Sequence, residues 1–325
     1  MNAQTNAQAN ARVAVRGDEE SYDVLVVGGG AAGLSAALSL ARARRRVAVV
    51  DDGSPRNAPA EGVHGFLSRD GMPPRHLLAA GRAEVTGYGG ELINDRVTAV
   101  EPGFAARLAS GRTLRARRLL VATGLRDELP EVPGLRERFG RDVLHCPYCH
   151  GHEVAGRALG VLGTQPLSAH QALLISQWSP DVTYFPGGPG GSAPTEEERA
   201  RLAARGVRIA EGEVTGLALG EDGRLRGVRL AGDRLVPREA LFVAPRFVPN
   251  DALLVALGCE RNAEGWAVAD PSGRTTAPGV WVAGNTADAR AQVVTAASQG
   301  VAAAAALNQD LLEEDVTAAL TAPAR

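Results

Sequence analysis

The pattern of apolar and polar positions predicts a strand, a turn and a helix near the start of the chain. The apolar run YDVLVV covers residues 22–27 and suits a buried strand. It leads into the glycine-rich GGGAAG at 28–33, after which LSAALSLARA places apolar residues at helical spacing. A second apolar run, VAVVDD, starts at Val47. This order predicts a β-α-β unit.

Two later segments also read as strands that end in small residues. RRLLVATG, from Arg117, ends at Thr123 and Gly124, and TTAPGVWVAGN, from Thr275, ends at Asn285. Parallel strands bring their carboxyl ends to one edge of a sheet, which is where cofactors lie. Taken alone, either segment could be a plain turn between a strand and a helix.

A second unit of this kind is predicted between residues 154 and 247. It consists of ALGVLG from Ala158, a helix-like SAHQALLISQW from Ser168, and a strand, VTYF, that ends at Phe185. Residues 186–194 are rich in Gly and Pro and indicate a loop. The predicted fold class is α/β, with two Rossmann-like, three-layer ββα dinucleotide-binding domains, the second inserted in the first. We expect a disordered tail over 1–20, a discontinuous domain over 21–152 and 249–325, and an inserted domain over 153–248.

Composition narrows the class of protein. The 325 residues allow two domains, and a net charge of −2 gives no support for nucleic acid or acidic membrane partners. The first twenty residues lack the apolar segment of a signal peptide, and no run approaches the roughly 18 apolar residues of a membrane span. We therefore expect a cytoplasmic protein.

The glycine spacing in the first turn points to a dinucleotide. Gly28, Gly30 and Gly33 satisfy GxGxxG, and Asp51 ends the second strand about twenty residues later. Such a turn needs a tight bend at the first glycine, close approach of a pyrophosphate at the second, and close helix–strand packing at the third. The pyrophosphate then lies on the N-terminus of the helix.

Residues 145–152, HCPYCHGH, carry the candidate redox chemistry. A CxxC pair can form a disulfide, and its thiolate can attack or resolve a mixed disulfide. His145 and His150 flank the pair as candidate proton acceptors, although a histidine beside a cysteine can be only a surface residue. Zinc binding and a glutaredoxin-like site are alternatives; the crowded ligands fit no usual zinc spacing, and glutaredoxins are shorter domains that carry the motif near their start. Cys259 is expected to be a buried small hydrophobe.

From Tyr22 to about Leu307 the chain resembles the low-molecular-weight thioredoxin reductases, a family of flavoproteins. The resemblance is carried by GGGAAG at 28–33, Asp51, ATG at 122–124, the CxxC pair, Pro249-Asn250, TTAPGVWVAGN from Thr275 and RAQVVTAASQG from Arg290. It implies FAD in the outer domain, a homodimer, Cys149 against the flavin, and Cys146 as the sulfur that attacks the external substrate.

The resemblance also assigns site residues. The predicted catalytic residues are Cys146 and Cys149, from the resemblance, and His150 and His145, from their position beside the pair. The implied cofactor-binding residues are Gly28, Gly30, Ala31, Ala32, Gly33, Asp51, Asp52, Arg56, Asn57, His64, Val97, Ala122, Thr123, Gly124, Gly284, Asn285, Gln292 and Val293. No metal site is expected.

The chain departs from the NADPH-dependent members of that family at several points. The inserted unit has Gly163-Thr164-Gln165-Pro166 where they carry a second glycine turn, and Phe185-Pro186-Gly187-Gly188 offers no cation for a 2′-phosphate. His150 replaces an acid beside the second cysteine, and Asn285 replaces an aspartate that contacts the ribityl chain. These features resemble the branch of dithiol oxidases that close disulfides in small natural products such as gliotoxin, holomycin and romidepsin.

The sequence therefore predicts an FAD-dependent oxidase that forms a disulfide in a small-molecule dithiol, with O2 as the acceptor and H2O2 as product. The expected partners are the dithiol, O2 and a second copy of the chain. An NADPH- or ferredoxin-linked reductase of a thioredoxin-like protein is the alternative. A flavin-binding sensor without turnover is a third, which the intact CxxC disfavours.

Overall fold

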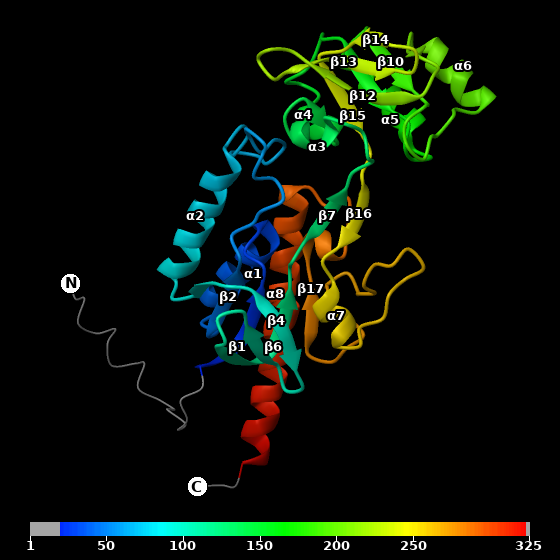
Figure 1. The fold of residues 1–325 in the computed structure, drawn as a ribbon. Coiled ribbons are helices and arrows are strands. Elements are labelled where there is room, and N and C mark those ends of the chain that lie inside the picture. Colours follow the sequence, from blue (N-terminus) through cyan, green and yellow to red (C-terminus); the bar gives the residue numbers. More distant parts are fainter. Residues whose placement is uncertain (1–19, 323–325) are drawn as a thin grey trace.

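The computed structural model describes residues 20–322 as two lobes connected by a pair of strands (Figure 1). Residues 1–19, which make up nearly all of the expected tail, lie outside the described residues, and Glu20 already begins the first strand, β1. No helix within residues 20–322 combines the length and apolarity needed to cross a membrane.

The larger lobe is built on a seven-stranded sheet. Its strands lie in the order β3-β2-β1-β6-β5-β4, and β17 pairs with the C-terminal end of β6. Strands β3, β2, β1, β6 and β17 run parallel, whereas β4 and β5 form an antiparallel extension. The bounds are β1 Glu20–Val27, β2 Val47–Asp51, β3 Glu91–Asn94, β4 Val97–Glu101, β5 Ala105–Leu108, β6 Thr113–Val121 and β17 Val280–Val282.

Two apolar cores cover the two faces of this sheet. On one face, helices α1 (Ala31–Arg42) and α8 (Val293–Thr321) pack with alternate residues of β1 and β2, and α2 (Pro74–Gly87) closes the side. On the other face, the remaining alternate residues pack against β4, β5 and α7 (Ala252–Ala256). Because side chains alternate along a strand, every strand at the centre is buried on both faces and reads as a continuous apolar run. The predicted ββα layering is confirmed.

Helix α8 continues to Thr321, well beyond the last residue of the sequence resemblance. Its final turns are held by ion pairs that join Arg45 and Arg117 to Asp315, and Arg118 to Asp310 and Glu314. Several carboxylates therefore share a set of arginines, a network that contributes more than isolated surface pairs do.

The smaller lobe contains a five-stranded parallel sheet in the order β11-β10-β9-β15-β8 and a three-stranded antiparallel sheet, β12-β13-β14. The strands are β8 Val143–Leu144, β9 Leu159–Leu162, β10 Val182–Phe185, β11 Arg208–Ile209, β12 Val214–Leu219, β13 Leu225–Leu230, β14 Arg234–Pro237 and β15 Ala240–Val243. The helices are α3 Leu135–Arg138, α4 Pro147–His150, α5 Ser168–Ile175 and α6 Glu196–Ala204. The strands and helix expected from residues 158–185 are confirmed.

The chain passes between the lobes through β7 (Leu125–Glu128) and β16 (Arg246–Pro249), which pair antiparallel. The structure departs from the expected boundary at residue 152. Strand β8 pairs with β15 of the smaller sheet, and its two residues are buried there. The segment that carries the cysteine pair therefore belongs to the smaller lobe. The sequence did not show this boundary, because a two-residue strand gives no periodic signal.

Candidate active site

The first glycine turn has the geometry that its spacing predicts. Gly28 has a positive φ of 105°, and a Cβ there would overlap the carbonyl oxygen of Ala122. A Cβ at Gly33 would overlap the carbonyl oxygen of Gly28, so helix α1 can approach β1 only with glycine at this position. A Cβ at Gly30, by contrast, would meet no protein atom within 4 Å.

The N-terminus of α1 beside Gly30 is open to a ligand. Gly30 is the N-cap and provides no side chain, and the first turn contains no acidic residue. Within residues 20–322 no side chain caps the backbone donors of Ala31, Ala32 and Gly33, which suit an anionic pyrophosphate. These residues fit the phosphates of FAD.

Asp51 braces the same turn. One carboxylate oxygen accepts from the backbone N–H of Gly29 at 3.0 Å, and the other pairs with Arg82. Of the other predicted cofactor residues nearby, Asp52 accepts from the N–H of Ser54, the carbonyl of Asn57 accepts from Ala60, and the side chain of Val97 is in the core.

The ends of β6 and β17 meet at one edge of the sheet, as predicted, and the end of β16 lies beside them. Thr123 donates through its hydroxyl to the carbonyl of Asn250 at 2.6 Å, and Asn250 returns a side-chain bond to Thr123 at 2.9 Å. Thr286 accepts from the N–H of Gly124 at 2.7 Å. Sequence reasoning missed Thr286, which is fully buried and fixes the turn after Ala122.

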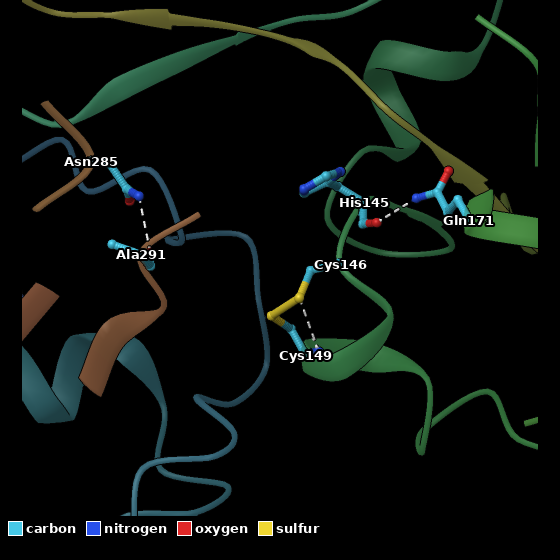
Figure 2. The surroundings of a disulfide bond; sticks show 6 residues. All are labelled: His145, Cys146, Cys149, Gln171, Asn285 and Ala291. Atoms are coloured by element: carbon cyan, nitrogen blue, oxygen red, sulfur yellow. Dashed lines mark hydrogen bonds between the residues drawn. A yellow bond between two sulfur atoms is a disulfide. The ribbon is translucent and has the colours of Figure 1, made fainter. Parts of the chain in front are cut away.

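Asn285 holds the loop between β17 and α8. Its side-chain nitrogen donates to the carbonyls of Asp288 at 2.8 Å and Ala291 at 3.0 Å; Figure 2 draws the second bond. Both partners are carbonyl oxygens, which accept hydrogen bonds. An aspartate at this position could not donate to them, and its carboxylate would repel both oxygens. Gly284 donates to Gln299 at 3.0 Å, and Gln292 is the N-cap of α8, directly before Val293.

Cys146 and Cys149 form a disulfide with Cα atoms 5.2 Å apart (Figure 2). Cys146 is the N-cap of α4, and its sulfur accepts from the backbone N–H of Cys149 at 3.2 Å. Pro147 at the first helical position favours this short helix. The side chain of Gln171 in α5 donates to the carbonyl of His145 at 2.8 Å and so ties the pair to the smaller lobe.

The two flanking histidines lie in different surroundings. The ring of His145 packs edge-on against Phe247 at 4.9 Å, and its Nδ1 is buried without a hydrogen-bond partner among residues 20–322. Burial, and next the charge of Arg56, lower the pKa of His145. Burial also lowers the pKa of His150 from its ordinary value of 6.5, whereas the nearby carboxylate of Glu153 acts in the opposite direction.

Arg56 and His64, both predicted to bind the cofactor, make contacts toward the smaller lobe and the connecting strands. Arg56 forms a bidentate pair with Asp127 of β7, at 2.7 and 2.6 Å, and lies over the ring of Phe247 in β16. His64 lies 3.5 Å from Glu153 of the smaller lobe. Sequence spacing gave no signal for either contact.

The corresponding turn of the smaller lobe is filled by the protein itself. The hydroxyl of Ser168 accepts from the N–H groups of Thr164 at 3.2 Å and Gln165 at 3.1 Å. A Cβ at Gly163 would lie 2.5 Å from the hydroxyl of Tyr184, which donates to the carbonyl of Ser192 at 2.5 Å. Sequence reasoning missed both Ser168 and Tyr184, and the only signal was a serine shortly after the glycine.

The loop after β10 also folds onto this turn. The N–H of Ser192 donates to the carbonyl of Gly163 at 3.1 Å, and a Cβ at Gly188 would lie 3.3 Å from the methyl group of Thr164. The N–H groups of Thr164 and Gln165 are thus already bonded within the protein, and the loop after β10 packs on the same turn, whereas the N-terminus of α5 has no side-chain cap.

Residues 22–300 match the model of the pyridine nucleotide-disulphide oxidoreductase family. Thioredoxin reductase sirT of Leptosphaeria maculans is 30% identical over 317 residues, which cover 91% of this chain and 96% of that protein. A probable thioredoxin reductase of Arthroderma benhamiae is 38% identical over 157 residues, which are 45% of this chain and only 39% of that protein.

Solved structures give the same fold. The crystal structure of HlmI superposes with a TM-score of 0.89 at 55% sequence identity, and the match covers 94% of this chain and 98% of HlmI.

Proposed function

The chain belongs to the pyridine nucleotide-disulphide oxidoreductase family, and we propose that it oxidises a small-molecule dithiol to a disulfide and passes the electrons to O2, which becomes H2O2. It is a flavoprotein oxidoreductase of the thioredoxin reductase type with FAD as its cofactor.

One observation carries the proposal: the nucleotide turn of the smaller lobe is closed by its own residues. Ser168 occupies the N–H groups of Thr164 and Gln165, and Gln165 stands where the open turn has Gly30. A pyrophosphate that bound to these N–H groups would have to displace the Ser168 hydroxyl from two part-buried hydrogen bonds, each worth about 0.5–1.5 kcal/mol. Electrons then enter from thiols instead of from a hydride donor.

The cysteine pair supplies the thiol chemistry. One thiolate of the substrate attacks the sulfur of Cys146, which breaks the Cys146–Cys149 bond and releases Cys149 as a thiolate. The second thiol of the substrate then attacks the substrate sulfur that is bonded to Cys146. This releases the cyclic disulfide and leaves both cysteines reduced. Bound FAD supplies the two-electron acceptor that restores the disulfide and the route to O2.

His150 is the proton acceptor that best fits this step. Its lowered pKa keeps the imidazole neutral near pH 7, and its side chain reaches the wall of a cavity between the lobes. His145 is enclosed and packs against Phe247, so its contribution is to support the segment before Cys146.

The names of the relatives favour a second candidate, a reductase of a thioredoxin-like protein. Anaerobic mixing separates the two. A dithiol such as dithiothreitol should bleach the oxidised flavin spectrum, NADPH should leave it yellow, and readmitted O2 should restore it with formation of H2O2. Rapid bleaching by NADPH would establish the reductase, and bleaching by reduced ferredoxin but not by dithiols would establish its ferredoxin-linked form.

We further propose that the active form is a homodimer. Helix α8 exposes apolar side chains at intervals that return to one side of the helix, namely Val294, Val301, Leu312, Val316 and Leu320. A second copy would cover this stripe, and light scattering of the holoenzyme measures the state.

A further inference from the structure

A cavity of about 420 Å³ lies between the lobes, and His150, the residue next to Cys149, is part of its wall. The larger lobe contributes Pro59, Gly62 and His64 to its wall, and the smaller lobe contributes Leu144 and His150. Neither cysteine lines it. The cavity therefore reaches the histidine beside the dithiol and does not reach the sulfurs.

His64 connects the two lobes across this cavity. Its Nδ1 lies 3.5 Å from a carboxylate oxygen of Asp70, and its Nε2 lies 3.5 Å from Glu153. Glycine at residue 62 leaves room for the imidazole, since a Cβ there would lie 3.1 Å from Nε2 of His64. An imidazole with a carboxylate near each nitrogen can receive a proton on one side and release it on the other.

Glu153 and His150 line the same cavity and are three residues apart in the chain. The carboxylate of Glu153 favours the charged imidazole of His150, and a charge on His64 disfavours it. The remaining charged groups that face the cavity are Glu61 from the larger lobe, and Arg138, Arg141, Asp142, Arg157, Arg224, Arg226 and Glu239 from the smaller lobe. Asp142 is engaged by Arg138, and Glu239 accepts from the N–H of Ala158, so neither is directed at His150.

We propose that this cavity is the outlet for protons released during thiol oxidation, with Glu153 as the positioning residue that draws the proton from His150 and His64 as its carrier toward Asp70. The inference rests on the proposed function. A dithiol that becomes a disulfide loses two electrons and two protons. The electrons pass through the cysteine pair to FAD, and the proton not retained with them leaves through the cavity to solvent.

The test uses the FAD-loaded full-length protein without O2 and with dithiothreitol as the probe. Flavin bleaching is followed by stopped flow from about pH 5 to about pH 9, and a pH indicator follows proton release. In Glu153→Gln we expect the limiting bleaching rate to fall about tenfold, less than for loss of a direct base. The rising limb of the pH profile should move to lower pH, because the charge that favours protonated His150 is gone.

Two variants serve as controls. Glu239→Gln removes a carboxylate from the same cavity and should keep the wild-type rate and limb. Glu153→Asp keeps the charge and should restore the position of the limb in part. FAD content and melting temperature show that each variant is folded.

The outcomes separate this inference from the proposed function. If dithiothreitol leaves the wild-type protein yellow, the proposed function and the outlet are both wrong. If the wild-type protein bleaches and Glu153→Gln has the wild-type profile, or is slower with an unmoved limb, the outlet alone is wrong.

Discussion

The two lobes share a β-turn-α arrangement, but the residues of the turn differ between them. At the first turn, Gly30 faces open space, and the N-terminus of α1 has no side-chain cap. At the second, Gln165 occupies the position that corresponds to Gly30, and the hydroxyl of Ser168 accepts from the N–H groups of Thr164 and Gln165, although α5, like α1, has no side-chain cap. One topology therefore carries an open glycine turn in the larger lobe and a turn bonded to its own side chain in the smaller lobe. In Figure 1 the smaller lobe lies above the sheet of the larger lobe, and we propose that its function is to present the disulfide.

The largest expected effect comes from removing the sulfur that the smaller lobe presents. Cys149→Ser should abolish turnover with any dithiol while FAD remains bound, since the first turn lies in the other lobe. Oxygen consumption and the flavin absorbance of the purified variant measure the two properties. Retained oxidase activity would remove the cysteine pair from the mechanism.

Loss of the proposed base should have the next largest effect. His150→Ala should slow anaerobic flavin bleaching by dithiothreitol about 100-fold at neutral pH. The defect should shrink above about pH 8.5, where thiols ionise without a base. In the wild-type protein the rate should rise as pH passes the pKa of His150, which burial places below its ordinary 6.5. A variant with the wild-type pH profile would exclude His150 as the acceptor.

The first turn offers a matched pair of substitutions. Gly33→Ala places a methyl group on the carbonyl of Gly28, and we expect a loss of about 1–3 kcal/mol in the free energy of unfolding, together with loss of FAD. Gly30→Ala meets no protein atom, so the apoprotein should keep its stability while FAD affinity falls about tenfold. Apoprotein melting and flavin titration distinguish them; equal stability losses would contradict an open site at Gly30.

The smallest effects are expected at the closed turn. Ser168→Ala should cost about 1–3 kcal/mol of unfolding free energy, because the N–H groups of Thr164 and Gln165 lose their acceptor. Tyr184→Phe should cost about 1 kcal/mol through loss of its bond to Ser192. Neither variant should gain NADPH binding, since Gln165 and Pro166 remain. Calorimetric titration with NADPH checks this, and binding by Tyr184→Phe would show that its hydroxyl alone closes the site.

Local patterns were sufficient for much of the molecule. Tight turns and buried strands depend on the spacing of neighbouring residues. The sequence therefore predicted the GxGxxG turn, the strands that end at Thr123 and Asn285, and the CxxC pair. The absence of a glycine pattern at residue 163 was equally visible. These features determined the fold class and the redox chemistry.

Only the tertiary structure decided how that chemistry is enclosed. Residues that meet across the lobes, such as His64 and Glu153, are 89 positions apart by their numbers, and no periodicity connects them. The filling of the second turn by Tyr184, the pairing of β8 with β15, and the role of Asn285 as a double donor depend in the same way on partners from other elements. The sequence by itself determined which groups can react and bind; the packing of distant segments determined which of them remain free to do so, because burial and hydrogen bonding are properties of neighbours in space.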